Sequence, residues 1–141
     1  MVSRALSQPQ AAGQVIYLLL LIRLMFVGLH GTIWLLSLGF SIVYERLEDK
    51  FCFLELDGNQ LMIEEVNNHW NTGNLEYPFG RGVNFSMEVD DINSLYEKVK
   101  RMKYPIFREL QVDSYQVGDK ECLDQQFLIQ DLDGYLLRFI H

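Results

Sequence analysis

Two copies of one short pattern dominate this chain. Near the end, Gln126–Phe139 reads QFLIQDLDGYLLRF, in which two apolar runs flank the pair Asp133-Gly134. This pattern predicts a strand, a tight turn and a second strand. The same pattern occurs earlier, where Phe51–Glu64 reads FCFLELDGNQLMIE. A chain that ends each half with the same hairpin is predicted to be a duplicated module.

Size and composition limit the class of protein. With 141 residues, the chain makes one domain or two small modules that share a core, and 49% hydrophobic residues supply that core. The net charge of -7 argues against nucleic acid as a partner and permits a cationic ligand. Cys52 lies in the middle of a predicted strand and makes no CxxC motif with Cys122. We therefore expect a free, buried thiol at Cys52 and a reducing, cytoplasmic location.

The first third of the chain is unusually apolar. From Val15 to Phe40 the strongly polar side chains are Arg23 and His30. The run is long enough for a membrane span, but Arg23 would sit inside it at a cost of about 2.5–3.5 kcal/mol. No small-residue cleavage site follows, so a secretory signal also fits poorly. We therefore favour a segment of the folded domain over a membrane span.

The remaining sequence alternates between strand and helix signals. We predict strands at Phe40–Arg46, Phe51–Leu56, Gln60–Val66, Gly82–Val89, Ile106–Val112, Gln125–Gln130 and Tyr135–Ile140. A helix capped by Asp90 or Asp91 is expected to run to about Met102, with Ile92, Leu95, Tyr96 and Val99 on one face. Asn67–Arg81 is predicted to be a long loop, and Asp113–Lys120 a polar turn.

The first half matches the second if the duplication is real. Leu38–Ile42 then aligns with Met102–Ile106 at a junction between helix and strand. A helix at Gly31–Ser37 and a first strand near Leu20–Val27 complete the order strand, helix, strand, strand, strand. These two elements fall inside the apolar run.

This order, with LLSLGFSIVYER, LMIEE, YPFGRGVNFSMEVDD and QFLIQDLDGYLLRF, resembles the vicinal-oxygen-chelate superfamily, in particular its glyoxalase and bleomycin-resistance branch. The resemblance covers about Leu36 to His141, and the amino-terminal third departs from the family pattern. It implies an α+β fold of two βαβββ modules whose sheets enclose a ligand crevice, in a chain that forms a homodimer. Residues 15–35 remain open to three interpretations: the family's first strand and helix, a membrane-type helix, or an out-of-frame segment.

The expected domain organisation follows from this alignment. Residues 1–13 form a flexible leader, residues 14–66 the first module, residues 67–81 a connecting loop, and residues 82–141 the second module.

The resemblance also implies where a metal would bind. Enzymes of the superfamily hold a divalent metal with His, Glu or Gln from the first and fourth strands of each module. Here Glu64 or Glu65 is suitable in the first module, but the second module has Asn84 and Arg138. An arginine cannot ligate a cation and repels one. No His, Glu or Gln lies between Leu20 and Leu29. We therefore expect no metal or other cofactor and no catalytic residues, and the three histidines suggest no other catalytic cluster.

The alternative is a binding protein. The bleomycin-resistance branch lacks metal ligands and sequesters a cationic, glycopeptide-type antibiotic in aromatic-lined crevices. The candidates for ligand contact are aromatic or polar: Trp70, Tyr77, Phe79, Asn84, Tyr115, Gln126, Arg138 and Glu64. Packing in the core is the alternative for Phe79, and an ion pair with Glu64 or Glu65 is the alternative for Arg138.

The sequence thus favours a cytoplasmic, dimeric, non-enzymatic protein that binds a small molecule, with bleomycin-type antibiotic resistance as the family expectation. Two alternatives stay open. One is a metal-dependent glyoxalase-like or dioxygenase-like enzyme. The other is a degenerate or membrane-tethered family member.

Overall fold

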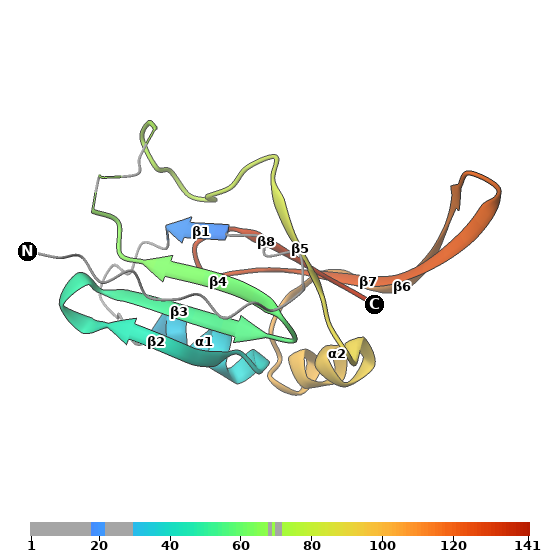
Figure 1. The fold of residues 1–141 in the computed structure, drawn as a ribbon, viewed down its shortest axis with the longest axis horizontal. Helices are drawn as coiled ribbons and strands as arrows, with labels where there is room; N and C mark the ends of the chain where they lie inside the picture. The colour runs from blue at the N-terminus through green and yellow to red at the C-terminus, as the bar shows by residue number, and fades with distance from the viewer. Residues whose placement is uncertain (1–17, 22–29, 68, 70–71) are drawn as a thin grey trace, which may run out of the picture.

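The computed structural model describes residues 18–21, 30–67, 69 and 72–141, with side chains from Thr32 onward. The described chain forms two four-stranded β-sheets with helices packed against them, arranged as in Figure 1. In chain order, the elements are β1 (Leu18–Leu21), α1 (His30–Leu38), β2 (Ser41–Arg46), a short 3-10 helix η1 (Leu47–Asp49), β3 (Phe51–Leu56), β4 (Asn59–Glu64), β5 (Asn84–Glu88), α2 (Ile92–Arg101), β6 (Ile106–Val117), β7 (Lys120–Gln130) and β8 (Leu136–Ile140).

The two sheets have the same topology. The first sheet has the strand order β1-β4-β3-β2, and the second has β5-β8-β7-β6. In each sheet the first strand of the module pairs in parallel with the last, and the other pairs are antiparallel. The predicted α+β fold of two βαβββ modules is confirmed.

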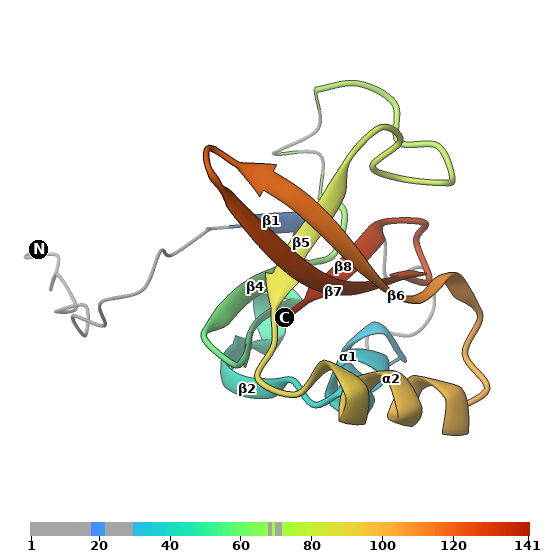
Figure 2. The same cartoon turned by 90° about the vertical axis from the view of Figure 1, so that its right-hand side faces the viewer.

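One apolar core joins the two modules. The helices α1 and α2 lie next to each other on the same side of the molecule (Figure 2). Each sheet turns its inner face to this core, through Leu54 and Ile63 in the first sheet and Phe127 and Phe139 in the second. All four side chains are 0–1% exposed. We call the opposite side of each sheet its outer face.

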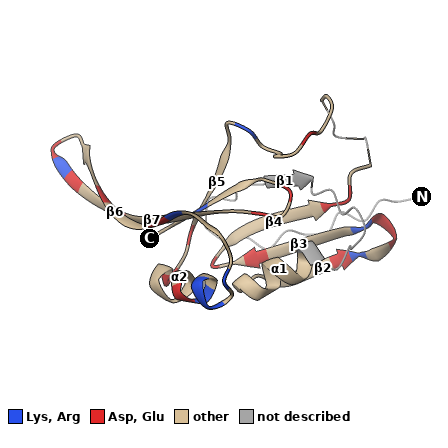
Figure 3. Ribbon diagram, turned by 180° about the vertical axis from the view of Figure 1, so that it is seen from behind, with Lys and Arg blue, Asp and Glu red and all other residues tan. Residues whose placement is uncertain are grey.

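The helix α2 follows the pattern expected from its sequence. The side chain of Asp91 accepts a hydrogen bond from the Ser94 amide at 2.9 Å and so caps the helix. Ile92, Leu95 and Val99 are buried, as the apolar stripe predicted. The last turn carries Lys98, Lys100 and Arg101, which gives the basic end of this helix in Figure 3 and suits the negative end of its dipole.

The two hairpin turns differ, although their sequences are alike. Asp57 and Gly58 link β3 to β4 with φ angles of 48° and 80°, as a two-residue turn of this kind requires. The last pair of β7 and β8 is Gln130 with Leu136, so this connection has five residues and the predicted tight Asp-Gly turn is wrong.

A buried carboxyl group explains the longer connection. Asp131 Oδ1 accepts hydrogen bonds from the amides of Asp133, at 3.0 Å, and Tyr135, at 2.7 Å. The Phe79 amide donates to the carbonyl of Asp133 at 2.9 Å, which ties the connection to the loop before β5. Asp131 is 6% exposed, and this burial raises its pKa to about 6.

The polar stretch 113–120 was predicted to be a turn, and this prediction is wrong. The stretch is part of a long hairpin of β6 and β7. β6 and β7 continue to pair from Val112 with Gln125 up to Val117 with Lys120. Since β8 pairs only with Gln126–Gln130, the rest of this hairpin is a two-stranded ribbon, which projects from the sheet in Figure 1. Both faces of this strand pair are exposed, so polar residues occur on both. The alternation of apolar and polar residues that indicates a strand is therefore absent.

The apolar amino-terminal run contributes β1 and α1. The helix was predicted at Gly31–Ser37 and spans His30–Leu38. The strand was predicted near Leu20–Val27 and is found at Leu18–Leu21, while residues 22–27 lie outside the described part of the chain. Within the described residues, no helix has the length and apolar character needed to cross a membrane.

A substitution at Gly134 tests the close contact between the β7–β8 connection and the loop before β5. Its φ is +94°, and an added Cβ would lie 2.5 Å from the Cα of Pro78. Gly118 is the matched control, because its φ is +63° and an added Cβ would meet nothing within 4 Å. Both alanine variants pay the left-handed backbone cost of about 1–2 kcal/mol. We expect Gly134→Ala to lose about 1–3 kcal/mol more free energy of unfolding than Gly118→Ala in urea denaturation. Equal losses would contradict the contact.

The raised pKa of Asp131 predicts that the stability of the fold depends on pH. Its folded-state pKa of about 6 lies above the ordinary 3.8, so the folded state binds the proton more tightly. The favourable contribution is therefore complete below pH 3.8 and is lost as the pH rises through 6. Relative to Asp131→Asn, the wild-type free energy of unfolding should be about 1.4 kcal/mol larger near pH 5 than near pH 7.5. Asp119→Asn, at an exposed position in the β6–β7 turn, is the control for the loss of an acidic side chain.

Candidate functional site

Three of the predicted site residues share the outer face of the second sheet. Asn84, Gln126 and Arg138 each precede a phenylalanine whose side chain packs in or against the core, namely Phe85, Phe127 and Phe139. Successive strand residues point to opposite faces, so the three polar residues point away from the core. The pairing of Leu128 with Arg138 and of Asn84 with Leu136 confirms the common face.

Arg138 forms an ion pair within its own sheet. Its Nη2 atom lies 3.1 Å from Oδ2 of Asp124 on β7, and the two side chains are 30% and 23% exposed. The Nε atom is buried and has no hydrogen-bond partner among the described residues. The alternative pairing with Glu64 or Glu65 is not found, because Glu64 is the last residue of β4 and Glu65 follows it, in the other sheet. Glu65 pairs with Lys50 at 2.5 Å, and Glu64 accepts a hydrogen bond from Asn67.

A hydrogen-bond network surrounds Gln126. This side chain is 4% exposed, and its Nε2 atom donates to Asp113 Oδ2 and, at 3.1 Å, to the hydroxyl of Tyr115. Gln111 Nε2 donates to the same Asp113 oxygen at 2.7 Å. The hydrogen bonds from Gln111 and then Gln126 lower the pKa of Asp113, so its carboxylate is charged at neutral pH. Sequence reasoning missed Asp113 because the prediction ended β6 at Val112.

The described aromatic candidates have different surroundings: Tyr115 lies on β6 beside Gln126, whereas Tyr77 and Phe79 lie in the loop before β5. Phe79 is 6% exposed, and its ring packs against that of Tyr135 with centroids 5.8 Å apart. It packs in the core, which is the alternative given for this residue, and a ligand contact by Phe79 stays a prediction. Tyr77 is 67% exposed and Tyr115 is 44% exposed. Trp70 lies outside the described residues.

Glu64 lies at a different place from the other candidates. It lines an open cavity of about 670 Å³ on the outer face of the first sheet. Tyr44, Arg46 and Met62 line this cavity too, and sequence reasoning did not select them. A usable signal was the alternation on β3 and β4, which places Phe51 opposite Glu64 and Phe53 opposite Met62 on one face.

Comparison with known proteins identifies the family. A glyoxalase/bleomycin resistance protein/dioxygenase superfamily member from Vibrio splendidus 12B01 is 37% identical to this chain, over 77% of this chain and 83% of that protein, with a TM-score of 0.40. The chain belongs to this superfamily. No family model matches the sequence, and neither does any curated protein.

Two further structures support the fold of this superfamily member. TioX from Micromonospora sp. ML1 has a TM-score of 0.68 at 16% identity, over 92% of this chain and 98% of that protein. A glyoxalase/bleomycin resistance protein/dioxygenase from Alicyclobacillus acidocaldarius has a TM-score of 0.59 at 21% identity, over 89% of both chains. The predicted fold class is therefore confirmed.

The residues present do not fit the metal site of a superfamily enzyme. The guanidinium of Arg138 occupies the position where a carboxylate ligand is expected, and it is already paired with Asp124. Asn84 replaces the expected histidine on β5. Within the part of the chain that the structure describes, no three His, Cys, Asp or Glu side chains are grouped to hold a metal ion. The polar outer face can instead offer hydrogen bonds to a ligand.

Proposed function

We propose that this superfamily member binds a small organic molecule on the outer faces of its sheets and sequesters it without chemistry. One observation carries the proposal: a positive side chain, Arg138, lies at the family's ligand position and forms an ion pair with Asp124 at 3.1 Å. The surrounding groups, Asn84, Gln126 and Tyr115, are hydrogen-bond partners rather than acids, bases or nucleophiles set up for catalysis. A cationic, glycopeptide-type antibiotic is the proposed ligand. The negative net charge supports it, and the ion pair with Asp124 neutralises Arg138, which would otherwise repel a cation.

A titration with copper-free bleomycin tests this proposal. We expect calorimetry of the wild-type protein to give saturable heat. Asn84→Ala removes an exposed amide from the outer face of β5 and should weaken binding about three- to tenfold, as the loss of one hydrogen bond does. Asn93→Ala, at an exposed position on α2, is the matched control and should bind as the wild type does. The absence of heat with the wild type would rule out this ligand. Stoichiometric zinc, nickel, manganese or iron in the purified protein would favour the enzyme alternative.

We also propose that the functional unit is a cytoplasmic homodimer. Every residue of the edge strand β2 is exposed, including Ile42 at 41% and Val43 at 55%. Exposed apolar residues on an edge strand favour association with another chain. The two free cysteines, Cys52 and Cys122, suit a reducing compartment.

Sedimentation equilibrium tests the dimer. We expect the wild type to have the mass of two chains, and Val43→Lys to shift the equilibrium toward one chain because a charge would enter the interface. Val83→Lys, at a similarly exposed valine of 51% that precedes β5, is the control and should leave the mass unchanged. A wild-type protein with the mass of one chain would contradict the proposal.

A further inference from the structure

We propose that a cavity at one end of the second sheet is a binding site for a small aromatic amine. The cavity has a volume of about 410 Å³ and lies where the α2–β6 junction meets the β7–β8 connection. Tyr77, one of the predicted contact residues, lines it from the loop before β5. Asn84, Gln126 and Arg138 do not line it, so the site does not rest on the proposed function.

The cavity lies beyond the paired part of the sheet rather than on its outer face. The first pair between β6 and β7 is Ile106 with Ile129. Residues 104–105 of the lining precede this pair, and residues 131–132 come after the end of β7. The β6–β7 ribbon projects from the opposite end of the same two strands (Figure 1). The cavity is therefore distinct from the surface that carries the polar network of Gln126.

Exposed apolar side chains surround the cavity. Tyr77, Phe107 and Leu132 all line it, and they are 67%, 61% and 54% exposed. They come from three separate segments of the chain: the loop before β5, the start of β6 and the β7–β8 connection. A flat ring placed among them covers apolar surface that otherwise faces water, and it can stack on the two aromatic rings.

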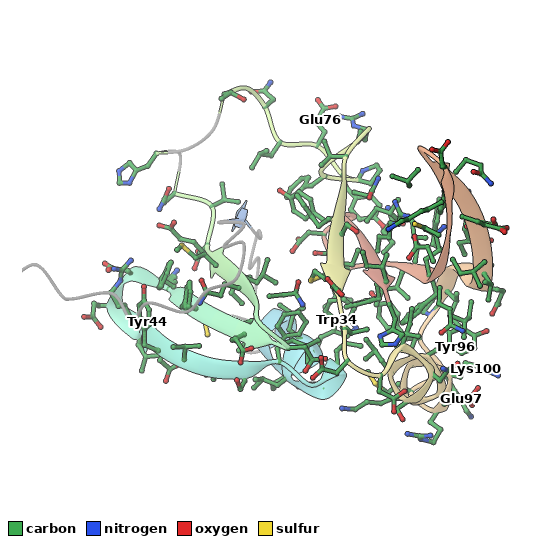
Figure 4. The ribbon with its side chains drawn as sticks, turned by 45° about the vertical axis from the view of Figure 1, so that its right-hand side comes forward. Trp34, Tyr44, Glu76, Tyr96, Glu97 and Lys100 are labelled. Carbon is green, nitrogen blue, oxygen red and sulfur yellow. The ribbon has the colours of Figure 1, made fainter. Side chains whose placement is uncertain are left out.

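The ring of Tyr104 is a fixed wall of the cavity. Its hydroxyl donates a hydrogen bond to the main-chain carbonyl of Gln130. Its ring also packs on that of Trp34 from α1, with centroids 5.0 Å apart. Figure 4 shows Trp34 near the centre of the molecule, so this wall is anchored to the interior. A wall that is already ordered lowers the entropic cost of binding a ligand.

The polar group left for a ligand is a hydrogen-bond acceptor. The hydroxyl of Tyr104 is engaged as a donor, and Gln130 Nε2 donates to the carbonyl of Gly134 at 3.0 Å. Asp131 Oδ1 accepts two main-chain amides, whereas Oδ2 accepts a hydrogen bond from none of the described residues. An ammonium group has three donors and no acceptor, so it complements Oδ2.

The charge of Asp131 favours an amine over a neutral donor. This residue is 6% exposed, and no Lys, Arg or His is found among the described residues that line the cavity. Its carboxyl group is largely ionised at pH 7.5, above its pKa of about 6. A carboxylate that is shielded from water and lacks a cationic partner attracts an ammonium group and repels an anion.

Two probes with the same ring and the same two-carbon chain test the proposal. At pH 7.5, 2-phenylethylamine carries a positive charge, whereas 2-phenylethanol is neutral. We expect calorimetry with the full chain to show that the amine binds about five- to tenfold more tightly, because it forms a charge-assisted hydrogen bond. Equal affinity for the two probes, or no saturable heat with the amine, would overturn the proposal.

Variants then locate the site. Phe107→Ala removes an exposed ring from the cavity and should weaken both probes about three- to tenfold. Asp131→Asn should weaken the amine about fivefold and leave the alcohol unchanged. Leu123→Ala is the control, because this side chain is 71% exposed on the ribbon at the other end of β7.

Circular dichroism shows whether each variant is folded. If Asp131→Asn unfolds the chain, Phe107→Ala and Leu123→Ala still decide the location, because both residues are exposed. A folded Phe107→Ala variant that binds the amine as tightly as the wild type does would refute the site. An equal loss in Leu123→Ala would do the same.

Discussion

The shared apolar core is the constraint on which the rest of this structure depends. Neither four-stranded sheet can cover its own inner face, and α1 and α2 contribute Leu35, Leu38, Leu95 and Val99 to the core that both inner faces share. Because one face of each sheet must meet this core, the alternate residues of every central strand are directed to the outer face. The positions of Asn84, Gln126, Arg138 and Glu64 are a consequence of that alternation.

The outer faces of the two sheets differ in the side chains that they present. In the second sheet, Arg138 and Asp124 form an ion pair beside a network of Gln111, Asp113 and Gln126. In the first sheet, aromatic rings from β2 and β3 border an acidic cavity. The same topology thus presents a hydrogen-bonding surface on one side and a stacking surface with excess negative charge on the other. Both surfaces are suited to noncovalent binding.

Local sequence patterns predicted much of the fold correctly. The turn at Asp57-Gly58 and the cap at Asp91 follow from short-range backbone chemistry, and both are found where the sequence placed them. Two of the failures have a common cause, which is the burial of a side chain that the sequence pattern placed in a polar turn or loop. Asp131 is drawn into the interior and lengthens the second turn, and Phe79 packs on Tyr135 although it lies in a polar loop. Neither contact leaves a periodic signal.

The sequence alone determined the duplicated module, the superfamily, and the face on which Asn84, Gln126 and Arg138 lie. These properties depend on alternation and turn chemistry, which are local. Only the tertiary structure decided the partners of those residues. It paired Arg138 with Asp124 rather than Glu64, brought Asp113 to Gln126, and separated Glu64 into a cavity on the other sheet. Side-chain partners depend on strand register and on the distance between sheets, and a linear pattern contains neither.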